Sequence, residues 1–187
     1  MALRFGWLSR VIVVSALLVG RDSEARKVGG PTGRPPVLQT SSWQTHIDAT
    51  YGFAIGYPND CVILKEGKLP TPTQLPAVQR VRFQQKEIAA GQFADLEPPR
   101  FTIHVFKRSS GRSLRDWLDS SGLLPLGSEI SAVRLKGAGK GFRVGLRQQL
   151  APNEFVYFAT EKYVYGLIPL GPESGKMLAS FRLIKTP

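Results

Sequence analysis

Two pairs of alternating apolar and polar runs in the C-terminal third of the chain are joined by turns too short to hold a crossover helix. In chain order the runs and turns are residues 129–136, Gly137 to Gly141, 142–150, 154–160, Glu161-Lys162 and 163–169. Alternation with a period of two predicts strands, and turns this short connect antiparallel neighbours. The pattern therefore excludes a doubly wound parallel sheet, whose strands need long crossover connections.

Further strands are predicted earlier in the chain, at residues 51–58, 81–85 and 100–107. Ser113 followed by Asp116 predicts a capped helix start, and Leu114, Trp117 and Leu118 then form one apolar stripe. A closing helix is predicted at residues 172–182. The sequence thus predicts an α+β fold, with a single antiparallel sheet of about six or seven strands flanked by helices.

The N-terminal segment has the order of a secretory signal peptide. Arg4 and Arg10 precede an apolar run at residues 11–20, and Ser23 and Ala25 place small residues before a cleavage point. We therefore expect a signal peptide at residues 1–25, a flexible linker rich in Pro and Gly at 26–42, and a folded domain at 43–187. A buried strand and an uncleaved membrane tether are the alternatives for residues 11–20. The expected location is secreted or periplasmic, peripheral to the membrane on its extracytoplasmic side.

The chain's charge and its cysteine content limit the classes of function. It has 187 residues, 25 Lys and Arg against 14 Asp and Glu, a formal net charge of +11, and one cysteine. A single cysteine excludes an intramolecular disulfide framework and a zinc finger. The positive balance favours anionic partners such as lipid headgroups, cell-wall polymers, nucleic acid or acidic proteins.

Two groups of basic residues are candidate partner-binding sites. The first lies on the predicted hairpin around Gly137 to Gly141 and is expected to present its cations on one side. The hairpin group is Arg134, Lys136, Lys140, Arg143 and Arg147, and the second group is Arg100, Lys107, Arg108, Arg112 and Arg115. A docking surface for an acidic partner is one interpretation, and a solvated polar face is the other. Without a recognition helix or an aromatic platform, specific nucleic-acid recognition is not expected.

Few residues are of the types used in catalysis. His46 lies two residues before Asp48, His104 stands between Thr102 and Phe106 on a predicted strand, and Cys61 follows the end of another. These positions fit structural roles better than a metal site or a nucleophile. The glycine-rich turn lacks the spacing of a P-loop. We expect a protein that is not an enzyme and holds no metal or cofactor, and keep a hydrolase using Cys61 or His46 as a further alternative.

Several segments together resemble the PsbP-like superfamily, which includes an extrinsic subunit of photosystem II and many exported bacterial domains. They are Trp43, YGFAIGYP at 51–58, FTIHVFKR at 101–108, SLRDWL at 113–118, the two late hairpins and MLASFRLI at 177–184. The resemblance implies an α/β/α sandwich and a surface-docking role beside a membrane complex. Cys61 stands where relatives usually have Trp, and the lipid-bearing Cys of many bacterial members is absent.

These expectations lead to one principal functional hypothesis. The chain is expected to be an exported, non-catalytic accessory protein that docks onto an acidic protein or membrane complex. The alternative is a general polyanion-binding protein, for cell-wall polymer, lipid headgroup or nucleic acid. The response of binding to salt separates the two, because phosphate-like contacts release counterions whereas a protein interface also buries apolar surface.

Overall fold

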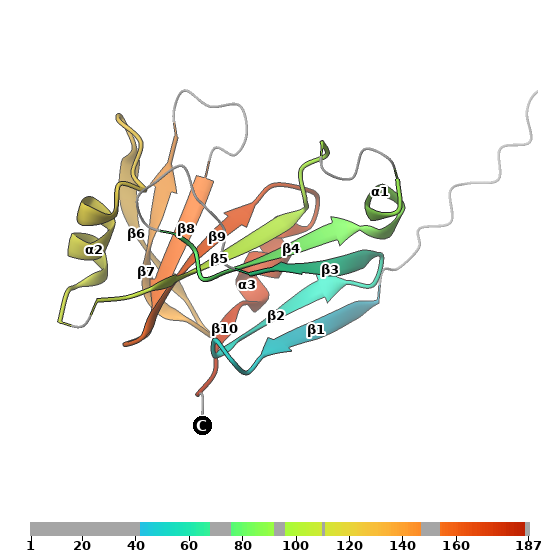
Figure 1. The fold of residues 1–187 in the computed structure, drawn as a ribbon, viewed down its shortest axis with the longest axis horizontal. Coiled ribbons are helices and arrows are strands. Elements are labelled where there is room, and N and C mark those ends of the chain that lie inside the picture. The colour runs from blue at the N-terminus through green and yellow to red at the C-terminus, as the bar shows by residue number, and fades with distance from the viewer. Residues whose placement is uncertain (1–41, 68–75, 92–95, 110, 147–153, 186–187) are drawn as a thin grey trace, which may run out of the picture. The chain divides into compact units, whose positions relative to one another are not determined.

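The computed structural model describes residues 42–67, 76–91, 96–109, 111–146 and 154–185 (Figure 1). The predicted signal peptide at 1–25, and all of the predicted linker except Ser42, lie outside these ranges. The elements are β1 (Trp43–Asp48), β2 (Phe53–Pro58), β3 (Cys61–Glu66), β4 (Gln79–Gln85), α1 (Lys86–Ala89), β5 (Phe101–Lys107), α2 (Leu114–Ser121), β6 (Glu129–Leu135), β7 (Gly139–Gly145), β8 (Glu154–Ala159), β9 (Tyr163–Pro169), α3 (Ser174–Ser180) and β10 (Arg182–Leu183). None of the described helices is long and apolar enough to cross a bilayer.

Seven strands form one antiparallel sheet in the order β3-β4-β5-β9-β8-β7-β6. Both predicted hairpins are present, since β6 pairs with β7 and β8 pairs with β9 in antiparallel register. The α+β class and the antiparallel sheet predicted from the sequence are therefore confirmed.

A second, three-stranded sheet, β1-β2-β10, was not part of the single-sheet prediction. Its strand β10 consists of Arg182, the last residue of the predicted closing helix, and Leu183, which follows it. The helix ends earlier because Phe181 adopts an extended conformation, and its N–H bonds to the carbonyl of Leu178 at 3.1 Å. Residues 182–183 then pair with β2, opposite Ala54 and Phe53.

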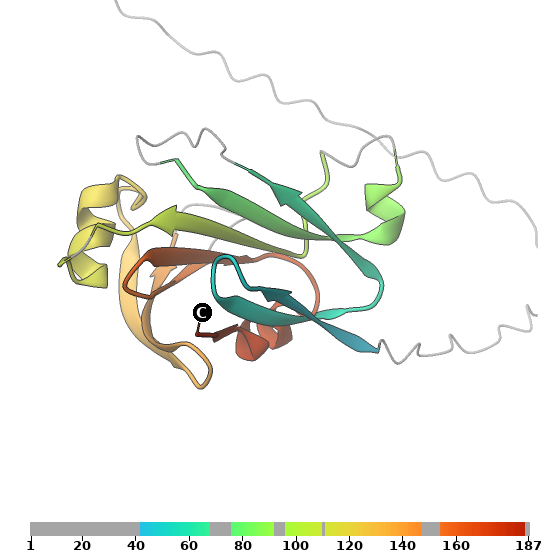
Figure 2. The same cartoon turned by 60° about the horizontal axis from the view of Figure 1, so that its bottom comes forward.

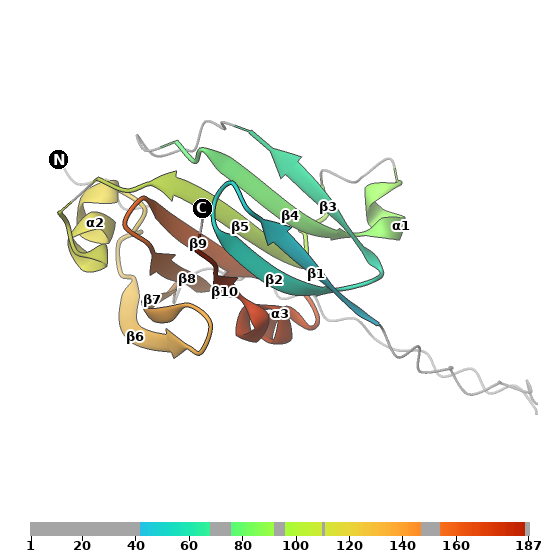
Figure 3. The same cartoon turned by 90° about the horizontal axis from the view of Figure 1, so that it is seen from below.

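The main core fills the space between the two sheets. Phe53 and Ile55 of β2 meet Val81, Phe83 and other residues of the larger sheet, and all of them are fully buried. Figure 3 shows the smaller sheet lying over one face of the larger one. The closing helix α3 completes this layer with Met177 and Leu178. Alternation along each strand produces this core, because every second residue faces the other sheet.

The opposite face of the seven-stranded sheet is covered at one end by α2, so α2 and α3 lie on different sides of that sheet (Figure 2). Trp117 and Leu118 of α2 are buried against Phe106, Tyr157 and Val164. The predicted stripe of this helix is thus confirmed as a packing face. Gly122 ends the helix with a φ of 70°, a left-handed conformation that glycine adopts without a steric penalty.

Candidate functional site

The hairpin of β6 and β7 carries the first predicted basic group. Its turn needs glycine at two places. Gly139 has a φ of 79°. A side chain at Gly137 would come within 2.8 Å of the Phe181 carbonyl oxygen and 2.5 Å of the Arg182 Cβ. The Gly137 carbonyl accepts a hydrogen bond from the Leu183 N–H at 2.9 Å. The turn is therefore fixed against β10.

The register of the hairpin divides its cations between two faces. Arg134 stands directly opposite Lys140, and Arg143 stands opposite Ser131. Since side chains alternate along a strand, Lys140 shares a face with Phe142, whereas Arg143 points to the other face. The expectation that all these cations lie on one side of the hairpin is wrong, because Lys140 and Arg143 are three residues apart on one strand.

An apolar pocket lies beside the Arg134 and Lys140 pair. It has a volume of about 410 Å³, and its lining includes Leu114 of α2 and Ala132 and Phe142 of the hairpin. Both cations are exposed at its border, and neither forms an ion pair with an acidic residue in the part of the chain that the structure describes. The arrangement combines an apolar floor with two available positive charges. Such a site suits a ligand that is both apolar and anionic.

The other hairpin cations differ in their surroundings. Arg143 is half exposed and lies 3.5 Å from a carboxylate oxygen of Glu154 on β8, so part of its charge is compensated. Lys136 is exposed in the turn. Arg147 lies outside the described residues. The pair of Arg134 and Lys140, with Lys136 next to it, is therefore the most available part of the predicted basic hairpin.

Four members of the second predicted group, Lys107, Arg108, Arg112 and Arg115, lie around the end of β5 and the start of α2. Arg108 donates to the Thr160 carbonyl at 2.7 Å and to the Arg112 carbonyl. Arg112 donates to the Ser120 hydroxyl at 3.1 Å, and Arg115 pairs with Asp119 at 2.9 Å. Lys107 is exposed. The three arginines are engaged in contacts that hold α2 and its preceding loop.

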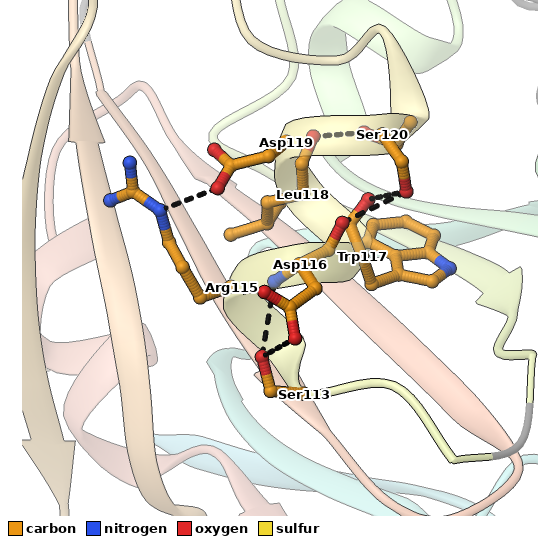
Figure 4. A network of polar contacts seen from close by, with 8 residues as sticks. Ser113, Arg115, Asp116, Trp117, Leu118, Asp119 and Ser120 are labelled. Atoms are coloured by element: carbon orange, nitrogen blue, oxygen red, sulfur yellow. Dashed lines mark hydrogen bonds and ion pairs between the residues drawn. The ribbon is translucent and has the colours of Figure 1, made fainter.

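The start of α2 is fixed by its cap (Figure 4). The Ser113 hydroxyl oxygen accepts from the Asp116 N–H at 3.1 Å, and the same hydroxyl donates to the Asp116 carboxylate at 2.7 Å. The predicted cap is confirmed. Because Leu114 is the next residue, the cap also positions the side chain that α2 contributes to the apolar pocket.

Arg100 does not belong with the rest of the second group. It precedes β5, whereas Lys107 is the last residue of that strand and the other three follow it. Its side chain is buried and donates to both Asp60 carboxylate oxygens, at 3.0 and 2.8 Å. Glu173 adds a third acidic contact at 3.6 Å. Arg100 is thus a buried ion-pair centre that joins the β2–β3 turn to the loop before α3.

Cys61 lies beside this ion-pair centre and is buried. Burial is the largest influence and raises the pKa of the Cys61 thiol to about 11, with nearby Arg100 opposing the shift. The thiol is therefore protonated near neutral pH. Because the thiolate is the reactive form, these surroundings do not activate Cys61 as a nucleophile.

The two histidines occupy structural positions. Burial, followed by the charge of Arg80, lowers the pKa of His104 to about 4, so the ring is neutral at pH 7. Burial and the charge of Lys65 lower the pKa of His46, against the raising effect of Asp48 at 3.9 Å. Asp48 is itself buried and accepts from Lys65 at 3.1 Å. No group of three or more metal-ligating side chains occurs among the described residues.

The sequence did not predict that two apolar side chains line one pocket. Leu114 and Phe142 were recognised as apolar positions on their elements but not as the walls of a shared pocket. Their meeting depends on α2 packing across β7, a contact between segments that the sequence pattern does not pair. The basic pair itself was found because both residues flank a recognisable turn.

The fold and this surface define an α+β sheet domain with a basic, amphipathic hairpin. No protein-family model matches the chain, and no curated protein matches it. Among solved structures, the chain is similar to the solution structure of cyanobacterial PsbP from Synechocystis sp. PCC 6803. The two share 13% sequence identity with a TM-score of 0.40, over 82% of this chain and 99% of that chain. At this TM-score the PsbP-like resemblance remains a prediction.

Proposed function

We propose that the chain is an exported, non-catalytic accessory protein that docks through the β6–β7 hairpin onto an acidic partner at the extracytoplasmic face of a membrane. The observation that carries the proposal is the pairing of Arg134 and Lys140 at the border of an apolar pocket, without an acidic counterpart among the described residues. Exposed charges of one sign steer complementary partners and add specificity. The apolar floor adds a contribution that salt does not screen.

The order of residues at the N-terminus supports export. Two arginines, the apolar run at 11–20 and the small residues before position 26 match the parts of a signal peptide. To test this, the full chain with a C-terminal tag is expressed in an exporting host. The mass of the recovered protein is expected to correspond to cleavage after Ala25. Intact protein retained in the cytoplasm would contradict export.

Docking is tested by binding of the tagged protein to native membrane and envelope fractions over a series of salt concentrations. The double variant Arg134→Ser with Lys140→Ser is compared with Lys86→Ser with Lys162→Ser, which removes the same charge from exposed positions elsewhere. We expect the hairpin variant to weaken binding about tenfold, as losing two charge contacts of roughly 0.5–1 kcal/mol each predicts. The matched control is expected to bind like the natural chain.

The salt series also distinguishes the alternative function. A partner protein held by charge and apolar contact is expected to remain bound at high salt, and to be a discrete species. Polyanion binding would give two results. The logarithm of the affinity would fall steeply and linearly with the logarithm of the salt concentration, and the bound material would be glycan, lipid or nucleic acid. Equal loss in both variants would remove the hairpin from the proposal.

A further inference from the structure

β6 forms one edge of the seven-stranded sheet. It pairs with β7 on one side, and in the described part of the chain no strand pairs with its other side. An edge strand presents a row of unpaired N–H and C=O groups that can pair with another extended chain. Natural edges are blunted by proline, by bulges, by charged side chains or by short length. β6 has seven residues and no proline, and its central residues from Ile130 to Val133 carry no charge, so it keeps a long edge suitable for pairing.

Space lies next to this edge on both faces of the hairpin. The apolar pocket beside Leu114 is on one face. A second pocket of about 470 Å³ extends to the other face, where Ser131 and Arg143 line it. Ser131 and Ala132 are exposed and small, which leaves this space open. A strand added beside β6 would direct alternate side chains to the two faces. The two pockets are placed to receive them.

The charges indicate what kind of chain can occupy this edge. Arg134 and Lys140 border the apolar pocket, and Lys136 lies in the adjoining turn. The second pocket is lined by Glu129 as well as by Arg143, which lies 3.5 Å from Glu154, so the available positive charge is on the face of the apolar pocket. An occupant with acidic residues near the turn and an apolar residue over Phe142 would complement them. The chain's own residues 26–41 do not, because they contain Arg26, Lys27 and Arg34 and no acid.

We infer that β6 binds an extended acidic segment of a partner protein as an additional strand. An apolar side chain of that segment lies beside Leu114 and Phe142, and acidic side chains two residues away, on the same face, lie beside Arg134 and Lys140. The inference rests on the proposed function, because it specifies how the acidic partner is held and which part of the partner is recognised. Backbone hydrogen bonds to β6 provide affinity, and the pockets and cations provide specificity.

The probe is a blocked seven-residue peptide with the sequence Thr-Asp-Thr-Leu-Thr-Asp-Thr, in which the Leu and both Asp side chains share one face of an added strand, titrated into the isotope-labelled full chain. Amide exchange is followed across residues 129–135. We expect the outward-facing, alternate amides of β6 to exchange at least about tenfold more slowly when the peptide is bound, because they become hydrogen bonded. Unchanged exchange throughout β6 on saturation with peptide would overturn the inference.

Two N-methylated isomers of the peptide test the backbone contacts directly. One carries methyl groups on the backbone nitrogens of peptide residues 2, 4 and 6, and the other on those of peptide residues 3, 5 and 7. In an added strand only one set faces β6, so one isomer is expected to lose at least about tenfold in affinity while the other binds like the parent. Equal affinity of both isomers would overturn the inference.

A side-chain variant tests the pocket without altering the edge. Ala132→Glu places a carboxylate among the hairpin cations and over the pocket, and Ala90→Glu makes the same change at an exposed site beyond α1. Peptide affinity is expected to fall at least tenfold for Ala132→Glu alone, with unchanged amide exchange in β5 as the check on folding. Equal affinity of the two variants would overturn the placement of the peptide.

Failure of the added strand is distinguishable from failure of the proposed function. In one outcome, Arg134→Ser with Lys140→Ser abolishes peptide binding, but N-methylation has no effect and the β6 amides stay unprotected. That outcome would overturn the inference of an added strand and would retain docking by charge. Absence of binding by both the peptide and the membrane fractions would overturn the two together.

Discussion

The guanidinium of Arg100 donates to both carboxylate oxygens of Asp60, at 3.0 and 2.8 Å, across 40 residues of sequence. Arg134 differs from it, because Arg134 is exposed and faces Lys140 rather than an acid. Two arginines that look alike in the sequence thus have different roles. One joins loops within the fold, and the other is available to a partner.

Loss of the buried arginine is expected to destabilise the protein. Arg100→Ala would leave Asp60 and Glu173 without their shared cation and remove side-chain packing against Gly171. We expect the free energy of unfolding to fall by about 2–3 kcal/mol, measured by urea denaturation. The control, Arg115→Ala, breaks an exposed pair with Asp119 and should cost about 0.5 kcal/mol or less. Equal effects of the two changes would contradict the burial of Arg100.

The stability of the protein is expected to decrease in mild acid because of His104. Its pKa is lowered from 6.5 to about 4 in the folded protein, mainly by burial. Between these two pH values the unfolded chain binds a proton that the folded protein excludes. Stability is therefore lost as pH falls from about 6.5 towards 4, by up to about 3 kcal/mol at the lower end.

Urea unfolding of the natural chain and of His104→Gln, measured from pH 7.5 to pH 4.5, isolates this contribution from that of the carboxylates. The variant is expected to lose less stability over that interval. Because Arg80 stands opposite His104 on β4, it also disfavours the protonated ring. Parallel pH profiles for the two proteins would show that the ring titrates normally.

The helix cap of α2 is expected to make a measurable contribution. Ser113→Ala removes the hydroxyl that bonds to the Asp116 N–H. We expect a loss of about 1 kcal/mol in the free energy of unfolding, since that N–H loses its partner at the helix terminus. Ser109→Ala, at an exposed position before the helix, serves as the control and should be close to neutral.

Cys61 is expected to be unreactive in the folded protein. Its thiol is buried, and its pKa is raised to about 11. A thiol reagent at pH 7.5 is expected to modify it about a hundredfold more slowly in the native protein than in guanidinium chloride. Rapid labelling of the native protein would contradict the burial of Cys61 and would favour the hydrolase alternative. In that case the double variant Cys61→Ser with His46→Ala is expected to abolish any hydrolase turnover.

The elements that the sequence predicted well are local ones. The hairpins, the apolar stripe of α2 and its cap each depend on residues within one short segment, so alternation, helical spacing and turn residues were enough to identify them. β10 could not be found in this way. It has two residues, and its conformation depends on pairing with β2, about 130 positions earlier.

The candidate site was predicted in part for the same reason. Arg134, Lys136 and Lys140 were found because they adjoin a glycine-rich turn. The faces on which they lie required the register of the hairpin, and the pocket required α2 to pack across β7. Arg100 was placed in the wrong group because sequence position alone does not reveal the approach of Asp60 and Glu173.

The last strand also determines when this protein can fold. The Ser180 hydroxyl accepts from the Gly56 N–H at 2.8 Å, β10 pairs with β2, and the Leu183 N–H bonds to the hairpin turn at Gly137. The third strand of the smaller sheet and the anchored turn thus both need residues near position 183. During synthesis, a ribosome-bound chain that has not yet reached these residues cannot close its main core.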